Sequence, residues 1–253
     1  MTTGSSPAVS SHTFDTTAVD EDVHPLDDPI RQSLRGVHAH FARWSGRIGG
    51  YHPDVAGHIG HPSVMQDEDW ADLAALVGPS TEVAVREPGH EPPPGWETLG
   101  SFGLVQMDGT DLVVEPDPDL VVLGTADVPE ILDLVARTRP GPYLPRTVEM
   151  GTYLGIRVNG RLVAMAGERL HPPGWSEISA VCTDAEFRGC GYGTRLVKAV
   201  GAGIRARGEI PFLHASAANT TAIRLYETLG FTLRKRSVLT RVRTPPERPV
   251  VPR

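Results

Sequence analysis

The stretch Arg188-Gly189-Cys190-Gly191-Tyr192-Gly193-Thr194, together with the run Glu177-Ile178-Ser179-Ala180-Val181-Cys182-Thr183 before it, indicates the fold class of this chain. The earlier run is rich in β-forming residues and predicts a strand. The glycines allow successive backbone N–H groups to turn toward one centre without obstruction by side chains. A helix that begins at this point adds the partial positive charge of its N-terminus. The pattern therefore predicts a site for a phosphate or pyrophosphate group.

The glycine spacing excludes two common nucleotide-binding loops. A Walker A loop ends in Gly-Lys-Ser/Thr, which is absent here. A dinucleotide fingerprint needs G-x-G-x-x-G, but Leu196 occupies the position of the third glycine. The acidic residue expected about 20 positions later is replaced by Phe212 or His214, and neither offers a carboxylate to a ribose. A glycine loop by itself is equally typical of a tight strand–helix turn.

Downstream of the loop, apolar periodicity and turn residues predict two helices and three strands. Gly208 and Gly230 are natural stops for the helices, and Asn219 is a natural cap for the second one. The predicted elements are a helix over Thr194–Arg207, a strand over Phe212–Ser216, a helix over Asn219–Leu229, and strands over Phe231–Arg236 and Val238–Arg243.

Upstream of the loop, the pattern predicts a strand over Leu120–Leu123 and an amphipathic helix that begins near Asp127 and Pro129. Asn159-Gly160 is a strong hairpin signal, because a type I′ turn needs positive φ at both central residues. The hairpin strands are Tyr153–Val158 and Arg161–Ala166. The resulting order, β-α-β-β-β-α-β-α-β-β, predicts an α/β domain built around one mixed sheet.

The remaining sequence suggests further segments. Residues 1–27 are rich in Ser, Thr and Asp and are expected to form a disordered leader, and residues 244–253 a Pro/Arg-rich tail. Residues 28–112 are expected to form an N-terminal α+β region of unknown role, which is open to interpretation as a degenerate copy of residues 113–243. Its predicted elements are helices near Arg31–Trp44 and Asp69–Val77, and strands over Glu82–Arg86 and Leu104–Met107.

Composition narrows the function class. The chain has 253 residues and a formal net charge of −7, which argues against nucleic acid as the main partner. A membrane helix needs an apolar run of roughly 18 residues or more. The chain has no such run, so we expect no membrane span. Two cysteines exclude a disulfide scaffold and, with no signal peptide visible, favour a cytoplasmic location.

Three separated motifs agree in order and spacing with one known family. They are the strand Glu177–Thr183, the loop Arg-x-x-Gly-x-Gly from Arg188, and Asn219-x-x-Ala222-x-x-x-Tyr226-x-x-x-Gly230-Phe231. Over about residues 117–243 the chain resembles the GNAT superfamily of N-acetyltransferases, in particular its FR-type and glycine-acyltransferase-like branch. The resemblance implies a mostly antiparallel, splayed sheet flanked by helices, with residues 113–243 as the acyl-CoA-binding catalytic domain.

The resemblance also implies a donor and its binding residues. The donor is acetyl-CoA or another acyl-CoA, used as a substrate, and no metal is implied. The strand end would bind the pantetheine amides, the glycine loop the pyrophosphate, Asn219 the pantetheine arm or the helix end, and Tyr226 would lie near the sulfur. The implied donor-binding residues are Val181, Cys182, Thr183, Arg188, Gly189, Cys190, Gly191, Tyr192, Gly193, Thr194, Asn219 and Tyr226.

Amine acylation needs a proton donor for the departing thiolate and an acceptor for the proton of the amine. Tyr226 is the candidate acid, because a phenol is protonated at neutral pH. Glu177 is the candidate base, since strand alternation places it on one face with Ser179 and Val181. The same alternation turns Cys182 into the core. Cys190 stands where many family members have Arg or Lys, which leaves only the backbone cradle for the phosphates.

Several alternatives stay open. His214 is either a second base or a packed strand residue. Eight of the ten histidines precede residue 112, but without a cysteine or an HExxH motif they do not indicate a metal site. The acceptor is a small amine, an amino acid or a peptide, and a homodimer is compatible with the fold. A non-catalytic acyl-CoA-binding module is the competing function.

Overall fold

The structure is a computed structural model that describes residues 24–246, so most of the predicted leader and tail lies outside the described residues. Eight strands form one sheet in the order β4-β11-β5-β10-β9-β8-β7-β6, and three short strands form a second sheet in the order β1-β2-β3. The mixed α/β fold with its mostly antiparallel sheet confirms the predicted fold class. Within the sheet, only β9 and β10 pair in parallel.

The strands of the large sheet are β4 Glu82–Arg86, β5 Glu97–Asp108, β6 Val121–Leu123, β7 Tyr153–Val158, β8 Arg161–Glu168, β9 Trp175–Thr183, β10 Ile210–Ser216 and β11 Thr232–Arg243. The small sheet contains β1 Ala42–Ser45, β2 Ile48–Tyr51 and β3 Ile59–Gly60. The α-helices are α1 Pro29–Arg35, α2 Asp67–Val77, α3 Val128–Thr138, α4 Tyr192–Ala206 and α5 Thr220–Thr228. Short 3₁₀ turns cover Pro25–Asp27, Ala39–Phe41, Thr125–Asp127, Thr147–Met150 and Ala185–Phe187.

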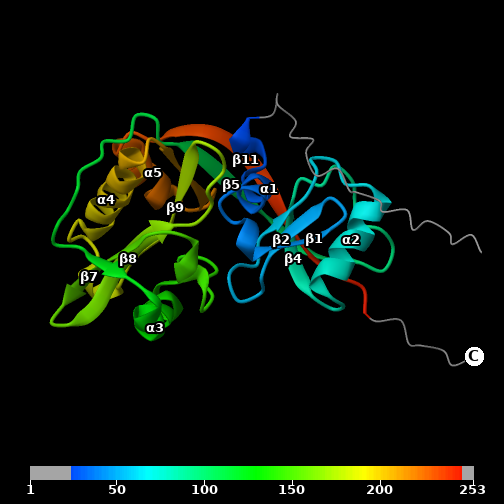
Figure 1. The fold of residues 1–253 in the computed structure, drawn as a ribbon, viewed down its shortest axis with the longest axis horizontal. Helices are drawn as coiled ribbons and strands as arrows, with labels where there is room; N and C mark the ends of the chain where they lie inside the picture. Colours follow the sequence, from blue (N-terminus) through cyan, green and yellow to red (C-terminus); the bar gives the residue numbers. More distant parts are fainter. Residues whose placement is uncertain (1–23, 247–253) are drawn as a thin grey trace, which may run out of the picture.

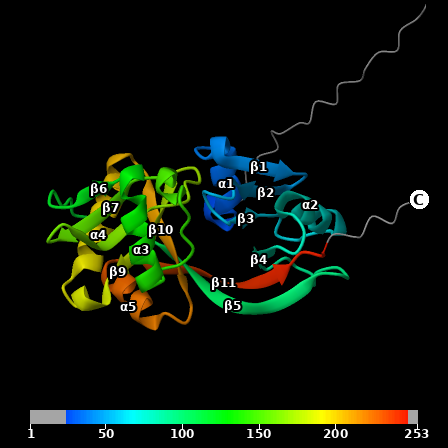
Figure 2. The ribbon, with the colours of Figure 1, turned by 90° about the horizontal axis from the view of Figure 1, so that it is seen from below.

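The molecule has two parts that lie side by side (Figure 1). Helices α3, α4 and α5 surround β6 to β9 in one part, while α1, α2 and the small sheet form the other. The long strands β5 and β11 run from one part into the other (Figure 2). Because β4 and β5 pair with β11, the large sheet continues across residue 112 and ties the N-terminal region to the second half of the chain.

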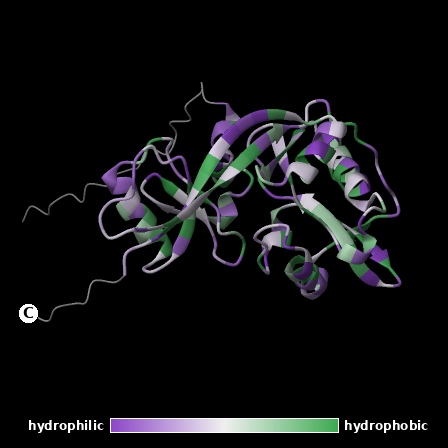
Figure 3. Cartoon of the chain, turned by 180° about the vertical axis from the view of Figure 1, so that it is seen from behind, coloured by the Kyte–Doolittle hydropathy of each residue, from purple (hydrophilic) through white to green (hydrophobic). Residues whose placement is uncertain are grey.

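Two helix-covered layers bury the second half of the sheet. Helices α4 and α5 pack on one face through apolar residues at helical spacing, such as Leu196, Val200 and Ile204. Helix α3 packs through Ile131 and Leu134 in a separate apolar cluster with β7 and β8. The long strands that join the two parts carry hydrophilic as well as hydrophobic residues (Figure 3). This arrangement fixes the position of the loop that joins β9 to α4.

The hairpin is confirmed. Asn159 has φ +51° and Gly160 has φ +82°. A type I′ turn requires positive φ at both positions, and β7 and β8 pair antiparallel on either side. Strand β4 has the predicted bounds, and the bounds of α3, α4 and α5 agree with prediction to within about two residues.

Two predictions about elements are wrong. The helix expected near Arg31–Trp44 ends at Arg35, because the N–H of Gly36 closes the last turn and Ala42–Ser45 then pairs with β2. The two strands expected at the C-terminal end are one strand, β11, which β5 pairs along its length. The N-terminal region has the order α1-β1-β2-β3-α2-β4-β5, which parallels α3-β7-β8-β9-α4-β10-β11 of the second half without α5, so its interpretation as a degenerate copy stays a prediction.

The N-terminal region packs against the rest of the chain through buried histidines. His38 is 1% exposed, and its Nδ1 lies 2.8 Å from the Tyr51 hydroxyl while its Nε2 lies 2.9 Å from the Met150 carbonyl oxygen. Nε2 must donate to the carbonyl, and in the neutral ring Nδ1 then accepts from the Tyr51 hydroxyl. Burial, assisted by nearby His171, lowers the pKa of His38 to about 4.

Lowering the pH should therefore reduce the free energy of unfolding, because His38 is protonated more readily in the unfolded chain than in the folded one. Its folded-state pKa lies below the value near 6.5 of an unfolded chain, so the unfolded state binds the proton first and stability falls as the pH drops below 6.5. Between pH 6.5 and 5 we expect a loss of about 2 kcal/mol in the free energy of unfolding from this residue. Denaturant titrations at several pH values measure it.

The substitution His38→Gln keeps one donor and one acceptor but cannot titrate, so its stability should vary less with pH over this range. The matched control is His52→Gln, because His52 is an exposed histidine of the same region. Equal pH dependence in His38→Gln and the unsubstituted protein would show that His38 does not contribute.

None of the helices in the described part of the chain is long and apolar enough to cross a membrane.

Candidate active site

A groove opens where two neighbouring strands part. β9 and β10 pair over only three residues, from Trp175–Ile210 to Glu177–Phe212. Beyond that point β9 continues along β8 while β10 continues along β5, so the strands diverge. A cavity of about 560 Å³ occupies the gap. Its lining includes Val181, Thr183, Arg188, Asn219 and Tyr226, which the sequence motifs assign to one site.

The groove leaves backbone groups of β9 available. On the side of β10, residues 178–183 have no strand partner, since the parallel pairing stops at Glu177. A ligand with amide groups can hydrogen-bond such an edge as an added strand does.

A β-bulge changes which way the side chains of β9 point. Ala180 has φ +54°, and the register with β8 shifts between Met165 and Gly167. As a result Val181 packs in the same cluster as Ile178, whereas simple alternation predicted opposite faces. Cys182 is buried among the α3-side residues, as expected of a core position, and burial raises the pKa of its thiol.

The glycine loop has the geometry of an anion site. Gly189 (φ +82°) and Gly191 (φ +77°) adopt left-handed backbone conformations, which other residues rarely take. Within the described residues, no backbone acceptor meets the N–H groups of residues 189–194. A Cβ added at Gly189, Gly191 or Gly193 would meet no atom within 4 Å. Open space and free N–H groups therefore face outward at the N-terminus of the 15-residue helix α4.

The side chains around the loop have separate roles. Arg188 lines the groove, and its Nε lies 3.4 Å from the Thr183 carbonyl oxygen at the end of β9. Cys190 is exposed and free. Asn219 caps α5, since its Oδ1 accepts from the Ala222 N–H at 3.1 Å.

Tyr226 lies in the groove wall opposite β9 and is 8% exposed. Its ring packs against Phe231, with ring centres 5.8 Å apart. Burial raises the pKa of Tyr226 to about 12, so its hydroxyl is protonated at neutral pH. No side chain or backbone group of the described residues forms a hydrogen bond with this hydroxyl, so it is available as a donor.

Glu177 lies at the last pair of β9 and β10, behind the groove, and it is completely buried and does not line the cavity. Arg169 donates to both of its carboxylate oxygens at 2.7 and 2.8 Å, and His214 Nδ1 lies 2.7 Å from Oε1. Burial opposes ionisation, but Arg169 and His214 outweigh it and hold the pKa of Glu177 well below its usual range. Glu177 is therefore an ionised anchor for its neighbours.

The neighbours of His214 fix its protonation. Its Nε2 lies 3.1 Å from Gln106 Nε2 and 3.3 Å from Arg86 Nη2. Both of these nitrogens are donors, so the His214 Nε2 must accept, which leaves the proton on Nδ1 for Glu177. Burial lowers the pKa of His214, so the ring is neutral and its basic nitrogen is Nε2.

Sequence reasoning missed Arg169, Arg86 and Gln106. Arg86 and Gln106 lie 128 and 108 residues before His214, and no local pattern links them. Their roles depend on the pairing of β4 and β5 with the rest of the sheet. Over residues 24–246, histidine, cysteine and acidic residues form no group of three or more suited to a metal ion.

Comparisons with known proteins agree with this geometry. The sequence model of the family "FR47-like protein" matches residues 153–240. A curated relative, mycothiol acetyltransferase from Thermobispora bispora, is 47% identical over 57 residues. That match spans 22% of this chain and 19% of the relative.

Two solved structures match over most of the chain. A GCN5-related N-acetyltransferase from Kribbella flavida is 18% identical, with a TM-score of 0.55 over 86% of this chain and 94% of that one, and shares the fold. An acetyltransferase-type protein of the GNAT family from Novosphingobium aromaticivorans is 39% identical, with a TM-score of 0.79. The match covers 89% of this chain and 100% of the chain from Novosphingobium aromaticivorans. The chain therefore belongs to the GNAT family of acetyltransferases.

Proposed function

We propose that this protein transfers an acetyl group from acetyl-CoA directly to an amine. The observation that carries the proposal is the groove between β9 and β10, which extends from Arg188, directly before the free backbone N–H groups at the start of α4, to a buried tyrosine hydroxyl. A phosphate-bearing thioester is the kind of donor that needs both features. Family membership and the match to an acetyltransferase support this choice of donor.

The residues present fit coenzyme A at three points. The N–H groups of Gly189–Thr194 suit the pyrophosphate, because they converge at a positive helix end with open space before them. The free backbone edge of Val181–Thr183 suits the pantetheine amides. Arg188 and Asn219 line the same groove as this edge.

The chemistry needs no covalent enzyme intermediate. The amine nitrogen attacks the thioester carbonyl carbon, the carbon–sulfur bond breaks, and the thiolate of coenzyme A leaves. Tyr226 donates a proton to this thiolate from a hydroxyl that burial keeps protonated. The proton balance is complete when a base removes one proton from the attacking amine.

On the base side we assign Glu177 an indirect role. Its two oxygens already accept from Arg169 and His214, and its pKa is low, so it is a poor direct proton acceptor. Through the Nδ1–H bond it holds His214 with Nε2 as the basic atom. Glu177 is then a positioning residue. His214, which lines the groove, accepts the proton once the amine replaces Gln106 and Arg86 as the donor to Nε2.

Release of the free thiol of coenzyme A from acetyl-CoA, measured across amines, amino acids and short peptides, tests the function. Release that depends on one class of amine and yields its acetylated product supports the proposal. If acetyl-CoA raises the melting temperature but no acceptor gives release, the non-catalytic binding module becomes the better reading. Without stabilisation or release, acetyl-CoA is not the donor.

The pyrophosphate assignment predicts an effect of charge at Cys190. Replacing this exposed residue by Asp places a negative charge beside the proposed phosphates. We expect the KM for acetyl-CoA to rise on the order of 10-fold. The melting temperature should change by no more than about 1 °C, because the side chain is exposed. Steady-state kinetics and thermal unfolding check both points.

The matched control is Cys190→Ser, which removes the thiol without adding charge and should leave the KM unchanged. Equal KM values in Cys190→Asp and Cys190→Ser would place the phosphates away from this loop.

A further inference from the structure

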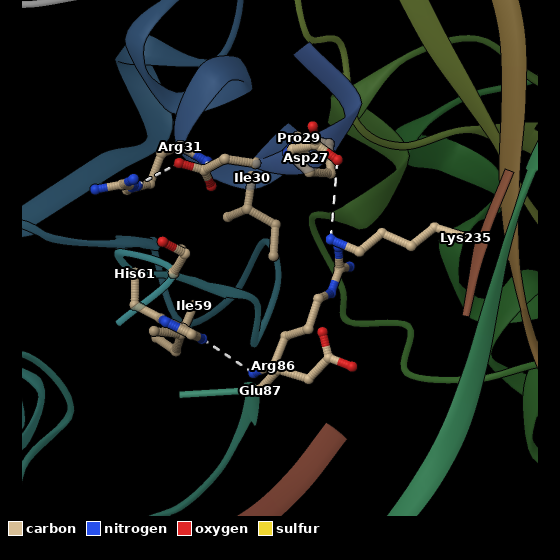
Figure 4. A pocket seen from close by; sticks show the side chains of 12 residues that line it. Asp27, Pro29, Ile30, Arg31, Ile59, His61, Arg86, Glu87 and Lys235 are labelled. Carbon is tan, nitrogen blue, oxygen red and sulfur yellow. Dashed lines mark hydrogen bonds and ion pairs between the residues drawn. The ribbon is translucent and has the colours of Figure 1, made fainter. Parts of the chain in front are cut away.

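A second pocket lies beside the groove, between the N-terminal region and the large sheet (Figure 4). It has a volume of about 220 Å³ and is lined from α1, the segment around β3, the end of β4 and β11. The side chains of Arg86 and Lys235 both point into it (Figure 4). This volume holds a molecule about the size of an amino acid, and it is smaller than typical pockets for drug-sized ligands, about 300–1,000 Å³.

Among the charged residues that line the pocket, Arg86 differs from the others. The acids already have partners: Asp28 binds Arg31, Asp27 accepts from Arg234 at 3.0 Å, and Glu87 accepts from the Val238 N–H at 3.2 Å. Lys235 lies 3.9 Å from Asp27. Arg86, which is half-buried, forms no ion pair with a carboxylate among residues 24–246.

Among the groups in direct contact behind the pocket, one positive charge therefore has no contacting carboxylate, and Glu177, Asp28 and Glu87 act on Arg86 only from beyond ion-pair distance. Arg169 and Arg86 are cationic, Glu177 is anionic, and His214 is neutral. His58, beside the same groups, is also neutral because burial lowers its pKa to about 3. An unmatched cation removed from water is costly, and an anionic ligand at Arg86 would neutralise it.

Arg86 also connects the pocket to the site of chemistry. Its Nη2 lies 3.3 Å from His214 Nε2, and His214 lines the groove between β9 and β10. A group bound to Arg86 is thus held next to the basic atom that the proposed mechanism needs. The opposite end of the groove belongs to the donor, so the pocket is left for the acceptor.

We propose that the acceptor is a small amine carrying a carboxylate close to its amino group, with the carboxylate bound by Arg86 and the amine beside His214. This inference rests on the proposed function and specifies its substrate class. The planar guanidinium matches a carboxylate with two parallel hydrogen bonds. With Arg86 turned to the carboxylate, the neutral amine replaces Gln106 as the donor to His214 Nε2 and loses one proton to it as the nitrogen bonds to the acetyl carbon. The carbon–sulfur bond of the thioester breaks, and the departing thiolate receives the proton of Tyr226.

Binding is tested apart from catalysis. Isothermal titration measures the affinity of the full chain, saturated with coenzyme A, for the twenty standard α-amino acids, their carboxamides and phosphoethanolamine. Coenzyme A carries no acetyl group, so there is no turnover. We expect at least one amino acid to bind, and its carboxamide to bind at least about 30-fold more weakly.

Substitutions at Arg86 test whether this residue binds the carboxylate. Arg86→Gln should remove the preference for the acid over the amide, and Arg86→Lys should retain part of it because the charge remains. The matched control is Arg241→Gln, since Arg241 is an arginine on β11 that pairs with Glu82 outside the pocket. A melting-temperature rise with acetyl-CoA in each variant shows that the fold and the donor site are intact.

Three results would overturn the inference: acid and amide binding equally, tighter binding of phosphoethanolamine than of any amino acid, or retained preference in Arg86→Gln. Failure of the proposed function looks different. In that case the amino acid binds through Arg86, but acetyl-CoA with the same amino acid releases no free thiol.

Discussion

Replacing Tyr226 by Phe should lower kcat by about 10²- to 10⁴-fold while the affinity for coenzyme A stays within about 2-fold. The substitution removes only the hydroxyl, and the ring keeps its packing against Phe231. The loss follows from the position of this hydroxyl in the groove wall, where no protein group of the described residues competes for its proton. Thiol release at saturating acetyl-CoA measures kcat, and titration calorimetry measures binding.

Tyr143→Phe is the matched control. Tyr143 is also 8% exposed, and its buried hydroxyl has no partner in the described structure, but it packs in the cluster with α3. Its loss should leave kcat unchanged. A kcat in Tyr226→Phe within a few-fold of the unsubstituted protein would assign protonation of the thiolate to another donor, such as water.

The pH dependence of kcat tests whether Tyr226 stays protonated. Because burial raises its pKa to about 12, the tyrosine should remain protonated at every pH between 6 and 9. Loss of activity at the acidic end must then come from protonation of the amine or of the base. A fall in kcat between pH 8 and 9 that disappears in Tyr226→Phe would contradict the raised pKa.

Replacing Glu177 by Gln should destabilise the fold by about 3–5 kcal/mol, because it leaves Arg169 buried without its counter-charge. For a chain of this size that corresponds to a melting temperature lower by on the order of 10 °C. The amide can still contact His214 and Arg169, so the loss reports the charge and not the shape. Thermal and denaturant unfolding measure it.

A double variant separates charge from packing. Replacing Arg169 and Glu177 together by Met removes both charges and should recover a large part of the stability lost in Glu177→Gln. Equal destabilisation in the single and double variants would mean that side-chain shape, not the unpaired charge, is responsible.

The difference in the free energy of unfolding between Glu177→Gln and the unsubstituted protein should become smaller at acidic pH. The folded-state pKa of Glu177 lies below that of an unfolded chain, near 4.3. The contribution of ionised Glu177 to stability is therefore complete above about pH 4.3, and it is lost as the pH falls toward the pKa of Glu177 in the folded state. A constant difference between pH 7 and 3 would contradict the lowered pKa.

Local signals in the chain are sufficient to predict the hairpin, the helices α3 to α5 and the glycine loop. Asn159-Gly160 requires positive φ, Gly191 permits the left-handed start of α4, and the apolar residues of α4 recur at helical spacing. Each of these signals acts over a few residues, so it can be recognised without knowledge of the rest of the chain. Asn219 was recognisable as a helix cap from its residue type, and the role of Tyr226 was implied by the resemblance to the GNAT superfamily.

The charged cluster of Glu177, His214 and Arg86, in contrast, depends on contacts between segments that are distant in the sequence. Arg86 reaches His214 because β4 and β5 join the sheet beside β11, across 128 residues of sequence. The bulge at Ala180 lies where β9 pairs with β8, and β9 separates from β10 where β10 continues along β5, so both depend on strands distant in the sequence. No local periodicity encodes how such segments pack, and so Arg86, which is proposed to bind the carboxylate of the acceptor, was invisible in the sequence, whereas His214 was a candidate without a known partner.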